Sequence, residues 1–239
     1  MEAFLKRKDG PSTSGGTGDG PKVAKLSAGA PTVRPRWSTM HGSMLARADP
    51  GSTPNTKIAA FDLDGTLQKT KSGRKNYMVA KDEMTDFIFW HNAVPSKLRA
   101  LHANGYKIVI FTNQASVQGA MAGVRADMVR GRIDRLAAEV GVPLQAYAAT
   151  QKGTKDSMSY CKPLGGMWAH MVKACNGGVA PDLARCYYVG DAAGRPKDFA
   201  DSDRGFALAA GVAFYTPEAF FTTVAAPGAG VPALGAGDG

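Results

Sequence analysis

The chain has 239 residues, of which 29 are Lys or Arg and 20 are Asp or Glu, giving a formal net charge of +9. This length suits one ordinary domain with tails, and the apolar fraction of 44% is enough to build a core. Three cysteines are an odd number, which argues against a disulfide framework and fits a reducing compartment. No apolar run approaches the ~20 residues that span a bilayer, so we expect no membrane segment.

More than half of the positive excess lies in the first quarter of the chain, because residues 1–57 contain nine basic and four acidic side chains. Residues 10–22, GPSTSGGTGDGPK, have too few apolar side chains to offset the entropy lost on ordering. We therefore predict a disordered basic leader over 1–36, a folded domain over 37–225 and a disordered tail over 226–239. Such a leader either attracts polyanions such as nucleic acid or is a solvated tail, and the sequence leaves both interpretations open.

Strands and helices alternate along the predicted domain. In chain order, the pattern predicts a strand running into a loop in 57–67, a helix in 90–106, a strand in 106–114, a helix in 123–142, a short strand in 144–150, a helix in 165–175, a strand leading to a loop in 184–194, and a helix with a final short strand in 205–221. The continuous apolar runs of the strands are typical of parallel strands covered on both faces. We therefore expect an α/β fold with a doubly wound, mostly parallel sheet, and a site at the strand C-terminal ends.

Two carboxylates follow the first predicted strand directly. Asp62 and Asp64 are two residues apart in FDLDGTL, so both can converge on one small volume while Leu63 points into the core. Gly65 permits a sharp turn of the backbone. Carboxylates in one place repel each other unless a metal or a shared proton intervenes, which makes this loop a candidate catalytic site. A loop that is acidic by chance is the weaker alternative in this strand-loop context.

FDLDGTL resembles the first motif of the haloacid dehalogenase superfamily of phosphotransferases, and three further pieces match in order. IVIFTNQ, with Thr112 and Asn113, resembles the second motif, CKP supplies Lys162 of the third, and YYVGDAAGRPKDFADSD supplies the acids of the fourth. With KPLGGMW and TPEAFF, these pieces resemble the phosphatase domain of polynucleotide kinase 3′-phosphatases over most of residues 57–221. This family usually has Arg where the chain has Cys161, which leaves a contact to nucleic-acid phosphate unassigned. The nucleotide-binding pattern GxxxxGK[ST] is absent, so the chain resembles the phosphatase-only form and we expect no kinase activity.

The resemblance implies a role in phosphomonoester hydrolysis for each motif residue. Asp62 is the expected nucleophile, which forms an aspartyl-phosphate intermediate. Asp64 is the expected general acid and then general base, kept protonated near neutral pH by crowding among carboxylates. Thr112 and Asn113 are expected to hold the phosphoryl oxygens, and Lys162 to offset negative charge.

Mg²⁺ is the cofactor that the resemblance implies. Asp62, the backbone carbonyl of Asp64 and Asp191 would supply hard oxygen ligands, and no His or Cys cluster points to zinc. Asp203 or Asp198 is expected to orient the motif-three lysine or a metal-bound water, with Asp203 favoured narrowly.

The motif spacing leaves no stretch long enough for a separate cap domain, so we expect a minimal cap and an open site that suits a macromolecular end. Basic side chains near the first and fourth motifs are candidates for contact with DNA phosphates: Lys69, Lys71, Arg74, Lys75 and Arg195. Contacts of this kind carry affinity but no sequence information, so we expect sequence-independent binding of DNA 3′-phosphate ends. A solvated charged loop is the alternative for all five.

The leading hypothesis is a Mg²⁺-dependent DNA 3′-phosphatase that clears strand-break ends for polymerase and ligase. The alternatives are a phosphatase of the same superfamily that acts on a small sugar or nucleotide phosphate, and a non-catalytic scaffold that binds DNA ends. The complete set of motif residues argues against the scaffold. A repair role predicts a nuclear protein, with an organelle pool left open, and interaction with repair proteins that the sequence does not identify. A monomer is the default expectation.

Overall fold

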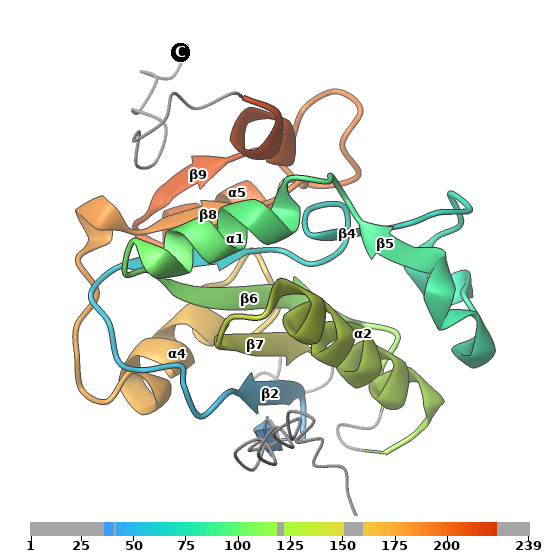
Figure 1. The fold of residues 1–239 in the computed structure, drawn as a ribbon, viewed down its shortest axis with the longest axis horizontal. Helices are drawn as coiled ribbons and strands as arrows, with labels where there is room; N and C mark the ends of the chain where they lie inside the picture. Colours follow the sequence, from blue (N-terminus) through green and yellow to red (C-terminus); the bar gives the residue numbers. More distant parts are fainter. Residues whose placement is uncertain (1–35, 41, 119–121, 151–159, 224–239) are drawn as a thin grey trace, which may run out of the picture. The chain divides into compact units, whose positions relative to one another are not determined.

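The computed structural model describes residues 36–40, 42–118, 122–150 and 160–223 (Figure 1). Within these residues, the main sheet has seven strands in the order β1-β2-β7-β6-β3-β8-β9. Five of them run parallel to one another, namely β3 (Ile58–Phe61), β6 (Lys107–Asn113), β7 (Leu144–Ala149), β8 (Tyr187–Val189) and β9 (Ala213–Tyr215). The central strand β3 pairs with β6 on one side and with β8 on the other, so the loops that follow these three strands emerge side by side.

Successive side chains of the central strands face opposite sides of the sheet. Ala59 and Phe61 of β3 belong to one buried cluster, whereas Ile58 and Ala60 belong to the other, and β6 alternates in the same way. Both faces are therefore apolar, and this explains why the sequence shows continuous apolar runs in place of a period of two.

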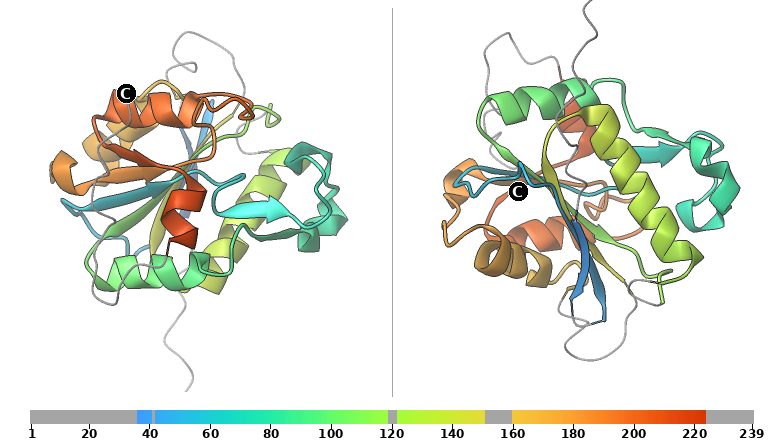
Figure 2. Two further views of the ribbon diagram at one scale, coloured as in Figure 1. Left: turned by 90° about the horizontal axis from the view of Figure 1, so that it is seen from above. Right: turned by 60° about the horizontal axis from the view of Figure 1, so that its bottom comes forward.

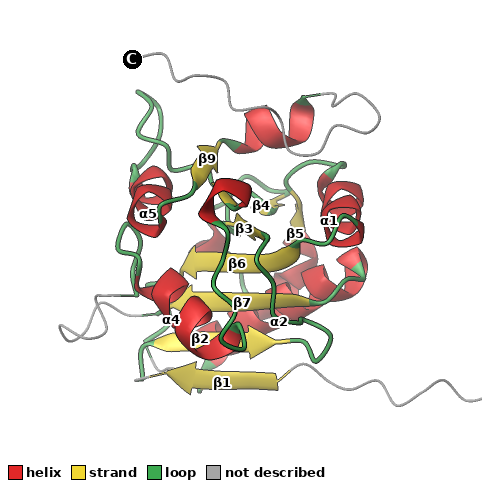
Figure 3. Cartoon of the chain, turned by 90° about the vertical axis from the view of Figure 1, so that its left-hand side faces the viewer, coloured by secondary structure: helices red, strands yellow, loops and turns green. Residues whose placement is uncertain are grey.

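Helices cover both faces of the sheet (Figure 3). On one face, α1 (Val94–Ala103) and α2 (Val124–Val140) bury apolar side chains in the first cluster. On the other face, α4 (Gly166–Cys175) and α5 (Ser202–Ala210) bury theirs in the second cluster. This arrangement confirms the predicted doubly wound α/β fold. No helix within the described ranges is both long and apolar enough to cross a membrane.

An antiparallel hairpin extends the sheet at one edge, and the sequence did not predict it. Strand β1 (Arg36–Met40) pairs with β2 (Met44–Ala48), and β2 pairs with β7. Arg36, the last residue of the predicted leader, begins β1 and is therefore structured. The rest of that leader and the predicted tail over 226–239 lie outside the described residues and stay predictions.

Residues 68–89, between β3 and α1, form a small unit that we call the flap. Strand β4 (Gln68–Thr70) pairs antiparallel with β5 (Phe87–Phe89), and the chain between them makes 3₁₀ turns at Asn76–Met78 and Lys81–Asp86. The flap projects from the body of the sheet beside α2 (Figure 2). Val79 and Phe87 of the flap pack on Met128 of α2. The flap agrees with the expected minimal cap, although its strands were not predicted.

Candidate active site

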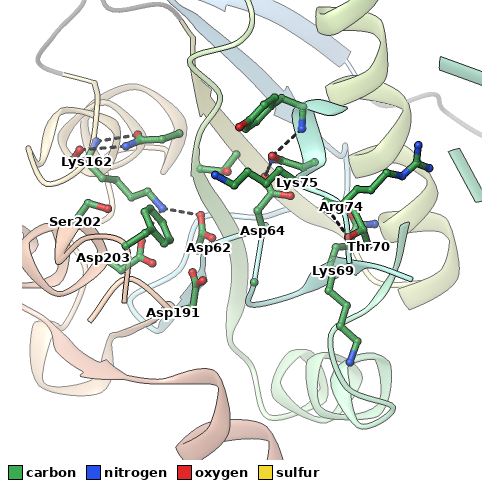
Figure 4. A pocket seen from close by; sticks show the side chains of 17 residues that line it. Asp62, Asp64, Lys69, Thr70, Arg74, Lys75, Lys162, Asp191, Ser202 and Asp203 are labelled. Carbon is green, nitrogen blue, oxygen red and sulfur yellow. Dashed lines mark hydrogen bonds and ion pairs between the residues drawn. The ribbon is translucent and has the colours of Figure 1, made fainter. Parts of the chain in front are cut away.

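The motif residues meet at the C-terminal ends of the three central strands (Figure 4). Asp62 directly follows β3, Thr112 and Asn113 end β6, and Asp191 lies two residues beyond β8. Lys162 comes from the loop that precedes α4. All five line one pocket of about 540 Å³, so the structure brings them together as the sequence predicted.

Lys162 is the central cation of this pocket. Its Nζ atom donates hydrogen bonds to Asp62 Oδ1 and Asp203 Oδ1, both at 2.6 Å, and to the hydroxyl of Tyr188 at 3.0 Å. All four side chains are buried. Burial alone would lower the pKa of Lys162, but Asp203 and Asp62 outweigh it and raise the pKa above its ordinary value. The ammonium group therefore stays charged and balances two buried carboxylates.

The carboxylates around Lys162 are crowded. Burial raises the pKa of Asp62 well above its ordinary value, Lys162 opposes this effect, and Asp203, Asp191 and Asp64 add to it. Burial, helped by the charge of Asp203, also raises the pKa of Asp191 to about 7. Asp62, Asp191 and Asp203 each offer an oxygen within 4.8 Å of the other two. A cluster of hard oxygen donors with unfavourable mutual repulsion can hold a hard divalent cation, which would relieve that repulsion.

Asp203 occupies a supporting place in this cluster. Its Oδ1 lies beside Lys162 Nζ and the Tyr188 hydroxyl, and its Oδ2 accepts a hydrogen bond from the backbone N–H of Ala192 at 2.9 Å. Asp198, in contrast, accepts hydrogen bonds from the backbone and the guanidinium of Arg195 and stabilises its own loop. The geometry therefore agrees with the choice of Asp203 over Asp198.

Two glycines allow the backbone to approach the carboxylates closely. Gly65 has a φ of +82°, and a Cβ atom at this position would collide with the carboxylate of Asp191. A Cβ atom at Gly190 would likewise collide with the side chain of Asp203. Glycine at both positions is thus required by the packing of the acidic cluster.

Thr112 and Asn113, the last two residues of β6, make different contacts. The buried hydroxyl of Thr112 accepts a hydrogen bond from Gln114 Nε2 at 3.0 Å and lines the pocket. Asn113 Nδ2 donates to the carbonyl of Lys162 at 3.1 Å, and Asn113 Oδ1 accepts from the backbone N–H of Lys162 at 2.9 Å. The side chain of Asn113 therefore positions the Lys162 loop.

Asp64 lies close enough to Asp62 and Asp191 for its charge to raise the pKa of both, and its own side chain turns toward hydrogen-bond donors. Asp64 Oδ2 accepts hydrogen bonds from Asn76 Nδ2 and from Gln114 Nε2, both at 2.7 Å, and Asp64 Oδ1 pairs with the guanidinium of Arg132. The Asp64 side chain is 26% exposed and still lines the pocket. The sequence did not identify these partners or Tyr188. Gln114 had a signal, because it follows the second motif directly in IFTNQ.

The five basic candidates for DNA contact have different surroundings. Lys69, Arg74 and Lys75 line the pocket, and all three belong to the flap. Arg74 also pairs with Glu83 of the flap at 3.0 Å, which partly neutralises it. Lys71 is exposed on the flap but does not line the pocket, and Arg195 is engaged by Asp198 and Glu218.

Two exposed aromatic side chains also line the pocket, and the sequence did not single them out. Tyr77 lies on the flap, and Phe199, which is 82% exposed, lies on the loop between β8 and α5. Both rings are exposed at the pocket, so they are accessible for contact with a ligand.

Comparisons with known proteins agree with the motifs. Residues 57–221 match the family model described as "Polynucleotide kinase 3 phosphatase". Polynucleotide 3′-phosphatase ZDP of Arabidopsis thaliana is 38% identical over 195 residues, which cover 78% of this chain and 27% of that protein. The bifunctional polynucleotide phosphatase/kinase of Schizosaccharomyces pombe is 39% identical over 188 residues, which cover 78% of this chain and 42% of that protein. The match thus spans less than half the length of either relative.

The fold has a solved counterpart. A crystal structure described as a HAD-like phosphatase from Mesorhizobium loti aligns with a TM-score of 0.55 and 20% identity, covering 74% of this chain and 80% of that one. This likeness confirms the haloacid dehalogenase-like fold, and the family match confirms the resemblance carried by the four motifs. The chain belongs to the polynucleotide kinase 3-phosphatase family.

Proposed function

We propose that this protein is a Mg²⁺-dependent polynucleotide 3′-phosphatase, which removes the 3′-phosphate from DNA strand-break ends and leaves a 3′-hydroxyl for repair synthesis and ligation. The observation that carries the proposal is the buried carboxylate of Asp62, held 2.6 Å from Lys162 Nζ inside an open pocket. Membership in the family supports it, as do one relative named as a polynucleotide 3′-phosphatase and one named as a bifunctional polynucleotide phosphatase/kinase. A repair role would place the protein in the nucleus.

The proposed reaction has two steps because a phosphate monoester has a poor alkoxide leaving group. In the first step, a carboxylate oxygen of Asp62 bonds to phosphorus while the bond from phosphorus to the 3′-oxygen breaks. Asp64 gives its proton to the departing 3′-oxygen, which leaves as a hydroxyl group. In the second step, water attacks phosphorus, its proton passes to Asp64, and inorganic phosphate departs from Asp62.

The side chains around Asp62 control charge and orientation. Lys162 fixes Asp62 Oδ1 and balances the negative charge that builds up when a phosphate dianion approaches a carboxylate. Asn113 fixes the Lys162 backbone, and the hydroxyl of Thr112 can donate to a phosphoryl oxygen in the pocket.

The donor set fits Mg²⁺. The Asp62 side chain, the Asp64 carbonyl and Asp191 would hold the ion with hard oxygen ligands, and Gly65 gives Asp191 the space to reach them. When bound, Mg²⁺ would neutralise charge on the phosphoryl group and help to align it.

The walls of the pocket favour a strand end over a small sugar phosphate. Lys69 and Lys75 of the flap can attract strand phosphates, and the rings of Tyr77 and Phe199 can stack on bases. Neither contact reads base sequence. A free sugar phosphate would leave these side chains unused.

An oligonucleotide labelled at its 5′ end and ending in a 3′-phosphate tests the proposal, with and without Mg²⁺. We expect Mg²⁺-dependent release of the 3′-phosphate by the wild type and none by Asp62→Asn. Turnover only of free sugar phosphates would refute the assignment of DNA as the substrate. Tight binding of the oligonucleotide without turnover would refute the assignment of the protein as an enzyme. Addition of ATP and a 5′-hydroxyl end should give no phosphate transfer.

A further inference from the structure

Arg132 of α2 is buried beneath the flap, with 2% of its side chain exposed. Its Nη2 atom pairs with Asp64 Oδ1, and its Nε atom donates to Gln68 Oε1 at 3.3 Å. The guanidinium carbon lies 3.9 Å from the centre of the Phe87 ring. Gln68 belongs to β4 and Phe87 to β5. One guanidinium thus joins α2, both strands of the flap and the carboxylate that lies two residues from the proposed nucleophile.

Packing of the flap does not by itself explain why a buried side chain at position 132 is charged. Removing a guanidinium from water is unfavourable unless the charge is paired, and an apolar side chain of similar volume often packs as well. Among the described residues, Asp64 is the carboxylate that forms an ion pair with Arg132. The buried cation is therefore matched to Asp64.

Both oxygens of Asp64 are held, by donors from three separate elements. Arg132 of α2 holds Oδ1, whereas Asn76 of the flap and Gln114 after β6 hold Oδ2. Without these donors the carboxylate would rotate about its side-chain bonds. After Asp64 has given a proton to the leaving oxygen, it becomes a carboxylate with this buried cation beside it, and such a charge-assisted contact is among the stronger hydrogen bonds.

We propose that Arg132 is a positioning residue that aims the Asp64 carboxyl group at the leaving 3′-oxygen, and that its contacts with Gln68 and Phe87 couple this aim to the placement of the flap. The inference rests on the proposed function, because it requires Asp64 to act as the acid and base. Arg132 acts through Asp64 and does not touch the substrate.

Leaving-group dependence separates positioning from folding. The 4-nitrophenolate ion departs without a proton, whereas the 3′-alkoxide of DNA needs one. The test compares the first-step rate of Arg132→Met and of the wild type by rapid quench, with a 3′-phosphorylated oligonucleotide and with 4-nitrophenyl phosphate. We expect a loss of about 100-fold for the oligonucleotide and of less than about threefold for the nitrophenyl ester. Arg132→Lys should recover part of the oligonucleotide rate.

Arg47→Met is the matched control, because the Arg47 side chain is 4% exposed and forms ion pairs with Asp49 and Asp134, outside the pocket. We expect both Met variants to melt at lower temperature, and only Arg132→Met to change the ratio of the two rates. Equal losses on both substrates, or a ratio like that of Arg47→Met, would overturn the inference. If Arg132→Met does not fold, the ratio of the two rates is measured for Arg132→Lys instead. A ratio equal to that of the wild type would then overturn the inference. A wild type that leaves the oligonucleotide intact would instead refute the proposed function.

Discussion

Replacement of Lys162 by methionine would remove the cation from two buried carboxylates. Lys162 Nζ lies 2.6 Å from Asp62 Oδ1 and 2.6 Å from Asp203 Oδ1, and all three side chains are buried. Removal of one partner from a buried ion pair typically destabilises a protein by about 3–5 kcal/mol, because the other charge is left uncompensated. We expect Lys162→Met to lower the free energy of unfolding by about this amount near pH 8 without divalent metal.

This destabilisation should depend on pH. Lys162 lowers the pKa of Asp62, which burial has raised, so its removal raises that pKa further. A carboxyl group whose pKa is higher in the folded than in the unfolded state binds more protons when folded. Its contribution therefore favours folding at low pH and is lost as pH rises through the folded-state pKa. We expect Lys162→Met to be less destabilising near pH 5 than near pH 8.

Urea unfolding at both pH values, in the presence of EDTA, measures the effect. Lys173→Met is the control, because Lys173 is exposed on α4, and we expect it to change stability by no more than about 0.5 kcal/mol. The reasoning is refuted if Lys162→Met destabilises no more than Lys173→Met near pH 8, or if its effect is the same at both pH values.

Three further predictions concern the metal, the acidic cluster and the flap. Mg²⁺ should raise the melting temperature more near pH 8 than near pH 5, because Asp191, with its pKa raised to about 7, must lose its proton to bind the ion; equal shifts would contradict this. Gly65→Ala should lower kcat by more than about tenfold without changing the circular dichroism spectrum, because the added Cβ displaces Asp191. An unchanged kcat would contradict a catalytic role for the cluster of Asp62, Asp191 and Asp203. Lys69→Ala combined with Lys75→Ala should raise KM for an oligonucleotide and weaken its salt dependence, with hydrolysis of 4-nitrophenyl phosphate unchanged; an unaltered KM would remove these lysines from the binding surface.

The parallel part of the fold could be predicted because its local patterns agree with its final environment. The run IVIF is apolar on both faces of β6, and the structure covers both faces. Helix α2 ends at Val140 because Gly141, with a φ of +73°, takes the left-handed conformation that closes a helix. Each of these signals lies within a few residues of the feature that it predicts.

The hairpin and the flap could not be predicted because tertiary contacts stabilise them. Strand β2 buries Arg47, and a buried arginine contradicts the pattern of an apolar strand until its partner Asp134 on α2 is known. Strands β4 and β5 have three residues each, too few for a period of two to be recognised, and the flap packs on Met128 of α2.

The candidate site likewise has residues that the sequence predicted and residues that it did not. The motif residues were predicted because each lies in a short, recognisable pattern, at the end of a strand or, for Lys162, just before a helix. The side chains that hold the motif residues were not predicted. Arg132 is 68 residues from its partner Asp64, and Tyr188 has the sequence context of a core residue within the apolar run YYV. Short motifs thus identify the side chains proposed to react, whereas the side chains that hold them in place are identified only by the structure.

The phosphorylated enzyme provides the most direct test of the central claim. The enzyme would be mixed with an oligonucleotide that carries a radiolabelled 3′-phosphate, quenched in acid within a single turnover, digested and mapped. We predict transient label on the peptide that contains Asp62, with none in Asp62→Asn. Release of labelled phosphate without protein-bound label at any quench time, or label on a different residue, would contradict the account.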